Sequence, residues 1–157
     1  MPAPLLHTDD GLTIRDRNKN GRLDVYEDPR RSLDERVEDL LAQMTLEEKA
    51  GLMFHTIAAV NPDGTLDPPA HGFMRTPIRA MVTEKLISHF NVHALPEPRL
   101  AAAWHNRLQE LAEDTRLGIP VTLSSDPRHS FSNNPAVSFM ARPFSQWPQP
   151  IGLGAIG

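Results

Sequence analysis

Residues 99–123, R-L-A-A-A-W-H-N-R-L-Q-E-L-A-E-D-T-R-L-G-I-P-V-T-L, carry the clearest structural signal in the chain. In 99–116, apolar side chains recur at helical spacing and charged side chains lie opposite them, which is typical of an amphipathic helix. That apolar face consists of Leu100, Trp104, Leu108, Leu111 and Thr115. Gly118 is placed to end the helix, and residues 119–123 form a short apolar run of the kind expected for a buried strand. A helix that leads into a buried strand favours an α/β architecture with parallel strands.

Two further helix starts precede this segment, each marked by a capping box. Ser32 stands three residues before Glu35, and Thr45 stands three residues before Glu48. The first helix places Val37, Leu40, Leu41 and Met44 on one face. The second offers Ala50, Leu52 and Met53 to the core. We therefore expect two helices joined by a sharp corner.

The other segments carry weaker patterns. Prolines and glycines in 60–77 rule out a long regular element, so we expect a surface loop there. Residues 78–86 can form a helix, and 87–93 can form either a short strand or a continuation of that helix. The chain closes with Q-W-P-Q-P-I-G-L-G-A-I-G, in which we expect neither a cap nor a final helix.

Length and amino-acid composition place the chain among globular proteins. Its 157 residues include 39% hydrophobic and 23% charged residues, enough for a core but fewer than the roughly 200 residues of a closed eight-stranded barrel. The formal net charge is −4 and no basic cluster lies on a periodic face, so we expect no nucleic-acid partner. No signal peptide and no long apolar stretch are visible, which predicts a cytoplasmic protein without a membrane partner. Export of a longer parent protein stays open.

The strongest local motif is D-R-N-K-N-G-R-L-D-V-Y-E at 16–27. A calcium loop of the EF-hand type needs side-chain oxygens at positions one, three and five, glycine at six, a carbonyl at seven and a bidentate carboxylate at twelve. The alternative is a tight polar turn without metal, because only three residues of the loop bring negative charge. The residues predicted to bind Ca²⁺ are Asp16, Asn18, Asn20, Arg22 through its carbonyl, Asp24 and Glu27.

A second candidate site, S-S-D-P-R-H-S at 124–130, follows the strand expected at 119–123. In barrel enzymes the catalytic face is built where strands end. The Asp126 carboxylate could accept hydrogen bonds from two adjacent sugar hydroxyls, with Arg128 or His129 holding it in place. The alternative is that Asp126 is a turn residue before proline.

Other candidates are weak. His89 and His93 are four residues apart, as in zinc helices, but F-N-V between them lacks the glutamate such sites use. Trp104 at a core position of its helix is most often packing. Ser124, Ser125 and Ser130 lack the G-x-S-x-G context of a serine hydrolase.

Together these motifs resemble the amino-terminal region of family 3 glycoside hydrolases of the β-glucosidase kind. The specific blocks are M-T-L-E-E-K-A-G at 44–51 and L-G-I-P-V-T-L-S-S-D-P-R-H at 117–129. The resemblance implies an α/β fold that is the first part of an incomplete (β/α)8 TIM-type barrel at 32–157, cut at its carboxyl end. Residues 1–31 form an extension that carries the loop at 16–27.

The resemblance also implies a retaining, exo-acting glycosidase with a carbohydrate substrate and no organic cofactor. The aspartate and histidine of the D-x-x-H block match Asp126 and His129, with Arg128 between them, as sugar-binding residues. The family's nucleophile lies in an S-D-W-like block that this sequence lacks, and its acid/base commonly comes from a later domain. We therefore expect no catalytic residue in this chain and no activity of the chain alone. The alternative is a non-catalytic calcium- or sugar-binding module.

Overall fold

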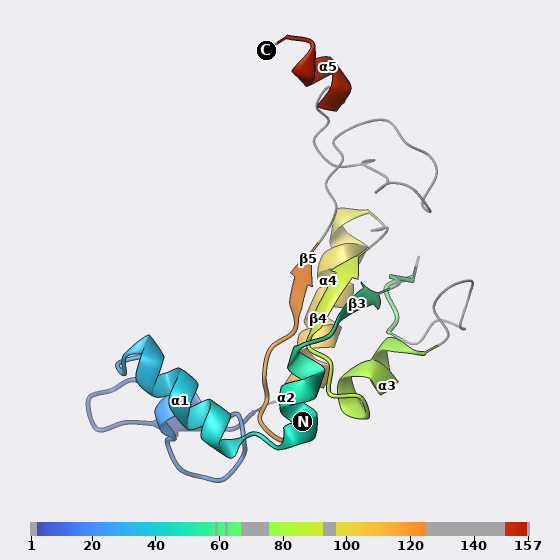
Figure 1. The fold of residues 1–157 in the computed structure, drawn as a ribbon. Helices are drawn as coiled ribbons and strands as arrows, with labels where there is room; N and C mark the ends of the chain where they lie inside the picture. Colours follow the sequence, from blue (N-terminus) through green and yellow to red (C-terminus); the bar gives the residue numbers. More distant parts are fainter. Residues whose placement is uncertain are drawn as a thin grey trace.

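The computed structural model describes residues 3–58, 60–61, 63–66, 76–92, 97–124 and 150–156. Two strands, a 3-10 helix (η1) and a helix come first, and between residues 46 and 124 helices and strands alternate in an α/β arrangement (Figure 1). The elements are β1 Leu5–His7, β2 Thr13–Arg15, η1 Val25–Glu27, α1 Leu33–Gln43, α2 Leu46–Leu52, β3 His55–Ala58, α3 Ile78–Thr83, β4 His89–Val92, α4 Pro98–Glu113, β5 Thr122–Ser124 and α5 Pro150–Gly154.

The main sheet is parallel and runs in sequence order, β3-β4-β5. His55 pairs with His89, which pairs with Thr122, so the three strands begin at the same level of the sheet. In Figure 1 the three arrows point the same way, with α4 behind them. The predicted α/β class with parallel strands is confirmed, and in the described residues the sheet does not close into a barrel.

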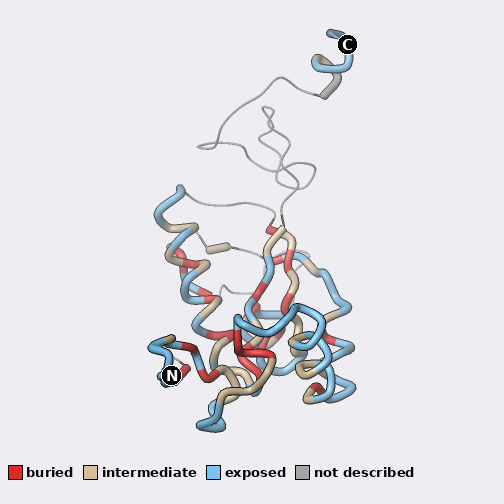
Figure 2. The backbone as a smooth tube through the Cα atoms, turned by 90° about the vertical axis from the view of Figure 1, so that its left-hand side faces the viewer, coloured by how far each residue is buried: buried red, intermediate tan, exposed pale blue. Residues whose placement is uncertain are grey.

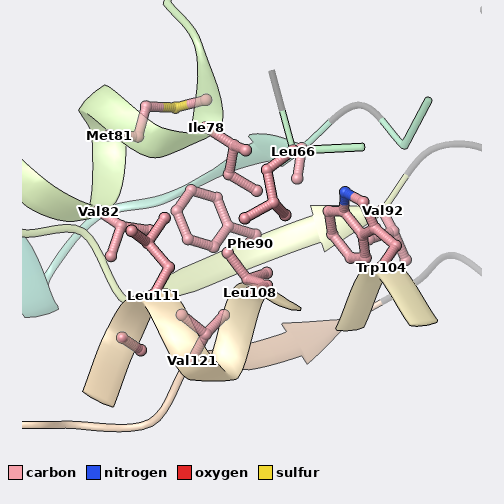
Figure 3. Packing of buried hydrophobic residues seen from close by; sticks show 12 residues of the cluster. Leu66, Ile78, Met81, Val82, Phe90, Val92, Trp104, Leu108, Leu111 and Val121 are labelled. Carbon is pink, nitrogen blue, oxygen red and sulfur yellow. The ribbon is translucent and has the colours of Figure 1, made fainter. Parts of the chain in front are cut away.

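One face of the sheet packs against α3 and α4 to form the core (Figure 3). Phe90 and Val92 point into it from the central strand, while Trp104 and Leu108 meet them from α4. All four are almost completely buried. The predicted apolar face of α4 is confirmed by the burial of Trp104, Leu108 and Leu111.

The opposite face of the sheet is polar and partly open. Because side chains alternate along a strand, the register places His55, Asn91 and Ser124 on this face. Ile57 lies there too and is 37% exposed.

Both predicted capping boxes are confirmed. Ser32 accepts from the Glu35 N–H and caps α1, and Thr45 accepts from the Glu48 N–H and caps α2. The reciprocal bonds from the Ser32 and Thr45 N–H groups to the glutamates are also present.

The expected burial of these two helices is wrong in part. Val37 and Leu41 are 45% and 39% exposed, and Met53 is 87% exposed. Figure 2 shows the backbone coloured by burial, with exposed residues in pale blue. Ala50 is also exposed, whereas Met44 is buried as expected. The spacing identified the apolar side of α1 correctly, but no described element covers its exposed residues.

The contact that seats α2 involves a glycine. Gly51 is the buried residue of this helix, and a Cβ built on it would lie 2.3 Å from the Leu86 carbonyl oxygen. Leu86 itself has a positive φ of 57°, so the turn before β4 comes close to the helix. The glycine of the M-T-L-E-E-K-A-G block is thus required by close backbone approach.

Several boundaries differ from expectation. The β1-β2 hairpin and β3 were not predicted, because three or four residues are too few for a periodic pattern. Of the two alternatives for 87–93, the strand is observed, at His89–Val92. Helix α4 ends at Glu113 rather than 116, and β5 begins at Thr122 rather than 119. A short helix, α5, forms where none was expected.

Candidate functional sites

The loop 16–27 is built around the carboxylate of Asp16. This side chain is 1% exposed and accepts from the backbone N–H groups of Asn20 at 3.1 Å and Gly21 at 2.8 Å. Gly21 has a φ of 77°, the left-handed conformation that glycine adopts without strain. The position-six glycine therefore makes the sharp turn that the motif predicts.

The other predicted ligands meet within the same loop. The Asn18 and Asn20 amides donate to Asp24 Oδ2 at 2.5 Å and 2.6 Å. Glu27 is 5% exposed and accepts from the Arg17 N–H at 2.5 Å and the Asp24 N–H at 3.2 Å. The structure thus brings together side chains from positions one, three, five, nine and twelve of the motif.

The donor set of the loop combines charged and neutral oxygens. Asn18 Oδ1 and Asn20 Oδ1 accept from backbone N–H groups two residues on, at 3.2 Å and 2.8 Å. Within the described residues no group of three or more His, Cys, Asp or Glu side chains is arranged to hold a metal ion. A cation here would depend on the amide oxygens and the Arg22 carbonyl as well as on carboxylates, as an EF-hand loop does.

The loop contains a buried tyrosine, Tyr26. Burial, and then the adjacent Glu27 carboxylate, raise the pKa of the Tyr26 hydroxyl above its usual value. That hydroxyl donates to the Leu117 carbonyl at 3.3 Å. The loop is therefore held against a segment about 90 residues later in the sequence.

The second candidate site begins where β5 ends. The last described residue of this region is Ser124, the end of β5. The predicted sugar-binding residues, Asp126, Arg128 and His129, lie outside the described residues. The Ser124 hydroxyl is 2.7 Å from His55 Nε2, so β3 and β5 are linked across β4 on the polar face of the sheet. The block 124–130 therefore begins at the carboxyl edge of a parallel sheet.

The structure also bears on the weak candidates. His89 lies in a strand, so the helical spacing of the supposed zinc pair does not apply, and His93 is outside the described residues. Trp104 is packing, as expected, and its Nε1 is buried without a partner in the described structure.

Sequence reasoning missed how the loop is anchored. Lys19 and Arg17 occupy motif positions that carry no ligand. Lys19 nevertheless reaches the end of α4 at Glu113, and Arg17 reaches the following turn at Gly118. No local pattern marks such long-range contacts.

Comparison with known proteins finds relatives that are 40–48% identical to this chain over most of its length, and those compared are β-glucosidases. Over most of its length the chain is therefore similar to one segment of β-glucosidases, which confirms the resemblance seen in its motifs. One relative is the probable β-glucosidase C of Aspergillus oryzae, 47% identical over 140 residues that make up 88% of this chain and 22% of the relative. Another is a periplasmic β-glucosidase/β-xylosidase of Dickeya chrysanthemi, 41% identical over 99% of this chain and 23% of the relative.

The chain spans somewhat more than a fifth of the length of these relatives. No protein-family model matches it. None of the helices in the described residues has the length and apolar character needed to cross a membrane.

Proposed function

We propose that this chain supplies the sugar-binding segment of a retaining, exo-acting β-glucosidase of the family 3 kind, which hydrolyses O-glycosidic bonds in carbohydrates. The observation that carries the proposal is the position of Ser124. It ends a parallel strand two residues before Asp126, at the sheet edge where α/β enzymes bind their ligands. The relationship to β-glucosidases supplies the class of reaction.

The architecture supports an incomplete barrel. Strands β3, β4 and β5 are parallel neighbours in sequence order, with α3 and α4 in the connections between them, as in the opening strands of a (β/α)8 barrel. Helices cover one face, while the face with Asn91 and Ser124 would line the barrel interior. Asn91 Oδ1 is buried on this sheet without a hydrogen-bond partner in the described structure. Such an acceptor would gain a donor from further barrel residues.

In the proposed site, Asp126 accepts hydrogen bonds from sugar hydroxyls, while Arg128 and His129 orient its carboxylate and complete the subsite. A retaining mechanism needs two further carboxyl groups, one as nucleophile and one as acid/base. We assign both to polypeptide beyond this sequence. The 157-residue chain alone then binds part of the sugar without cleaving its bond.

The division of labour can be tested with an aryl β-glucoside. A full-length enzyme that contains this segment should release the aryl group and give first the β-anomer of the sugar, as judged by proton NMR. The purified 157-residue chain should give no turnover. Turnover by the chain alone that is abolished by Asp126→Ala would place the whole reaction in this segment. Absence of turnover from the full-length enzyme would remove the glycosidase assignment.

We further propose that the loop 16–27 binds Ca²⁺ as a structural ion. The favouring observation is that Asp16 and Glu27 are buried carboxylates of one short loop, with Asp24 beside them. Bringing like charges together out of water is unfavourable, and a divalent cation would offset that cost. The Asn18, Asn20 and Arg22 oxygens would complete its coordination, and the ion would add charge neutralisation to a loop already shaped by backbone bonds.

Calorimetry tests the calcium proposal directly. Glu27 would supply two ligands, so Glu27→Gln should weaken binding more than Asn18→Ala does. Arg22→Met is the matched control, because it keeps the carbonyl that would bind the ion. Absence of calcium heat in the unaltered chain, or equal affinity in Glu27→Gln, would contradict the proposal.

A further inference from the structure

Lys19 points out of the loop 16–27 and towards the end of α4. Its Nζ donates to the carbonyl oxygens of Glu113 at 2.6 Å and Thr115 at 3.0 Å. The last carbonyls of a helix have no intrahelical partner, and a cation there also favours the negative end of the helix dipole. Lys19 thus caps the carboxyl end of α4 from a segment 94 residues away in sequence.

The Lys19 backbone adopts an uncommon conformation. Its φ is 60°, in the left-handed region that costs a non-glycine residue conformational energy. Lys19 stands at position four of the motif, which supplies no ligand to a bound ion. Its charge therefore serves the contact with α4 and not ion coordination.

Three further contacts join the same two segments. Arg17 Nη1 donates to the Gly118 carbonyl at 3.3 Å, and a Cβ on Gly118 would lie 2.8 Å from the Arg17 carbonyl oxygen. Arg15 forms an ion pair with Glu113 at 2.8 Å. The Tyr26 hydroxyl reaches the Leu117 carbonyl from the other end of the loop.

The contacted segment leads directly to the second candidate site. Leu117 and Val121 are buried, so the turn after α4 cannot shift without disturbing packing. The Thr122 N–H then donates to the Ser88 carbonyl at 2.8 Å and β5 pairs with β4. Only three residues of β5 pair with β4, so the position of this strand depends on the turn before it.

We propose that Lys19 is a positioning residue that ties the loop 16–27 to the end of α4, so that ordering of the loop also orders the turn after α4 and strand β5. The dependence of this effect on calcium rests on the calcium proposal above. The contact between the loop and α4 does not.

The test is hydrogen exchange of the 157-residue chain with and without CaCl₂. In the unaltered chain, calcium should slow exchange of amides in 114–118 and 122–124 by about three-fold or more, the size expected for a well-placed exposed charge contact. Lys19→Met should still give calcium heat and slower exchange within 16–27, but lose the effect at 114–124. Lys19→Arg, which keeps a cationic donor, should restore it.

Lys49→Met is the matched control, because it removes one positive charge from an exposed position of α2, outside the loop 16–27. It should behave like the unaltered chain. If calcium still slowed amide exchange at 122–124 in Lys19→Met, the proposal would be overturned even though calcium binds.

If the unaltered chain gives no calcium heat, the calcium proposal fails and the contact is judged without the ion. Lys19→Met should then exchange about three-fold faster than Lys49→Met at 114–118. Equal rates in the two variants would overturn the positioning role.

Discussion

Helices α1 and α4 have similar amphipathic patterns but opposite surroundings. Trp104 and Leu108 of α4 are completely buried against the sheet, whereas Leu33 and Val37 of α1 are largely exposed. Helix α1 is held instead by polar contacts: Asp39 accepts from the Tyr26 N–H at 2.9 Å, and Arg36 Nε donates to the Tyr26 carbonyl at 3.0 Å. Apolar spacing thus shows which side of a helix can be buried, while the partner of that side depends on the rest of the protein.

The largest difference should appear when one core residue is compared with one α1 residue. Leu108→Ala leaves a cavity beneath the sheet and should lower the free energy of unfolding by about 2–5 kcal/mol. Val37→Ala should change it by less than about 0.5 kcal/mol. Chemical denaturation followed by circular dichroism measures both. A Val37→Ala loss as large as that of Leu108→Ala would show that α1 is covered in solution.

The close approach of α2 to the turn before β4 gives the next effect. Gly51→Ala would force the backbone of Leu86 away from the helix and should cost about 1–3 kcal/mol of stability. Gly154→Ala is the matched control, because nothing lies within 4 Å of a Cβ there. Thermal denaturation that ranks the two glycine variants equally would show that α2 is not seated on this turn.

Capping should matter more to α1 than its apolar side chains do. Ser32→Ala removes the acceptor of the Glu35 N–H and should cost about 1 kcal/mol. Ser32→Asp keeps an acceptor and should restore most of that stability. An unfolding free energy that falls less for Ser32→Ala than for Val37→Ala would reverse the account of what holds this helix.

The smallest effect concerns the link that precedes α1. Hydrogen bonds from Arg30 hold the pKa of Asp28 at about 2, below the roughly 3.9 of an unfolded aspartate. A lowered folded pKa stabilises the fold above pH about 4, and that contribution is lost as the pH falls towards about 2. Stability measured across this range should therefore decline less steeply in Asp28→Asn than in the unaltered chain. If stability fell with pH equally steeply in both proteins, the lowered pKa of Asp28 would be contradicted.

Local chemistry made much of the fold predictable. The Ser32 and Thr45 caps fixed the starts of α1 and α2, and the spacing of Trp104 and Leu108 identified the buried face of α4. The end of α4 was placed three residues too late, because the apolar spacing continues to Thr115, past the last helical residue Glu113. Strand β3 was missed because its four residues are strand only through pairing with β4.

The two candidate sites also differ in how far they depend on local sequence. All the predicted ligand positions of the loop 16–27 lie within twelve consecutive residues, so the motif alone predicted its sharp turn at Gly21. The sugar-binding site proposed after β5 needs residues from several strands. The local sequence could predict only the one strand that leads into it, β5. Its sugar-binding residues were proposed from their position after a strand and from the resemblance. These residues, Asp126, Arg128 and His129, lie outside the described residues.

The sugar-binding role of Asp126 is tested most directly by kcat/KM of Asp126→Asn in a full-length enzyme that contains this segment. Loss of a charge-assisted hydrogen bond of about 1.5–3 kcal/mol predicts a ten-fold to hundred-fold or greater decrease, with an unchanged melting temperature. Asp24→Asn in the loop is the control, and it should lower thermal stability while leaving kcat nearly unchanged. If both variants instead lost activity in proportion to stability, Asp126 would be a structural turn residue and the sugar-binding assignment would be wrong.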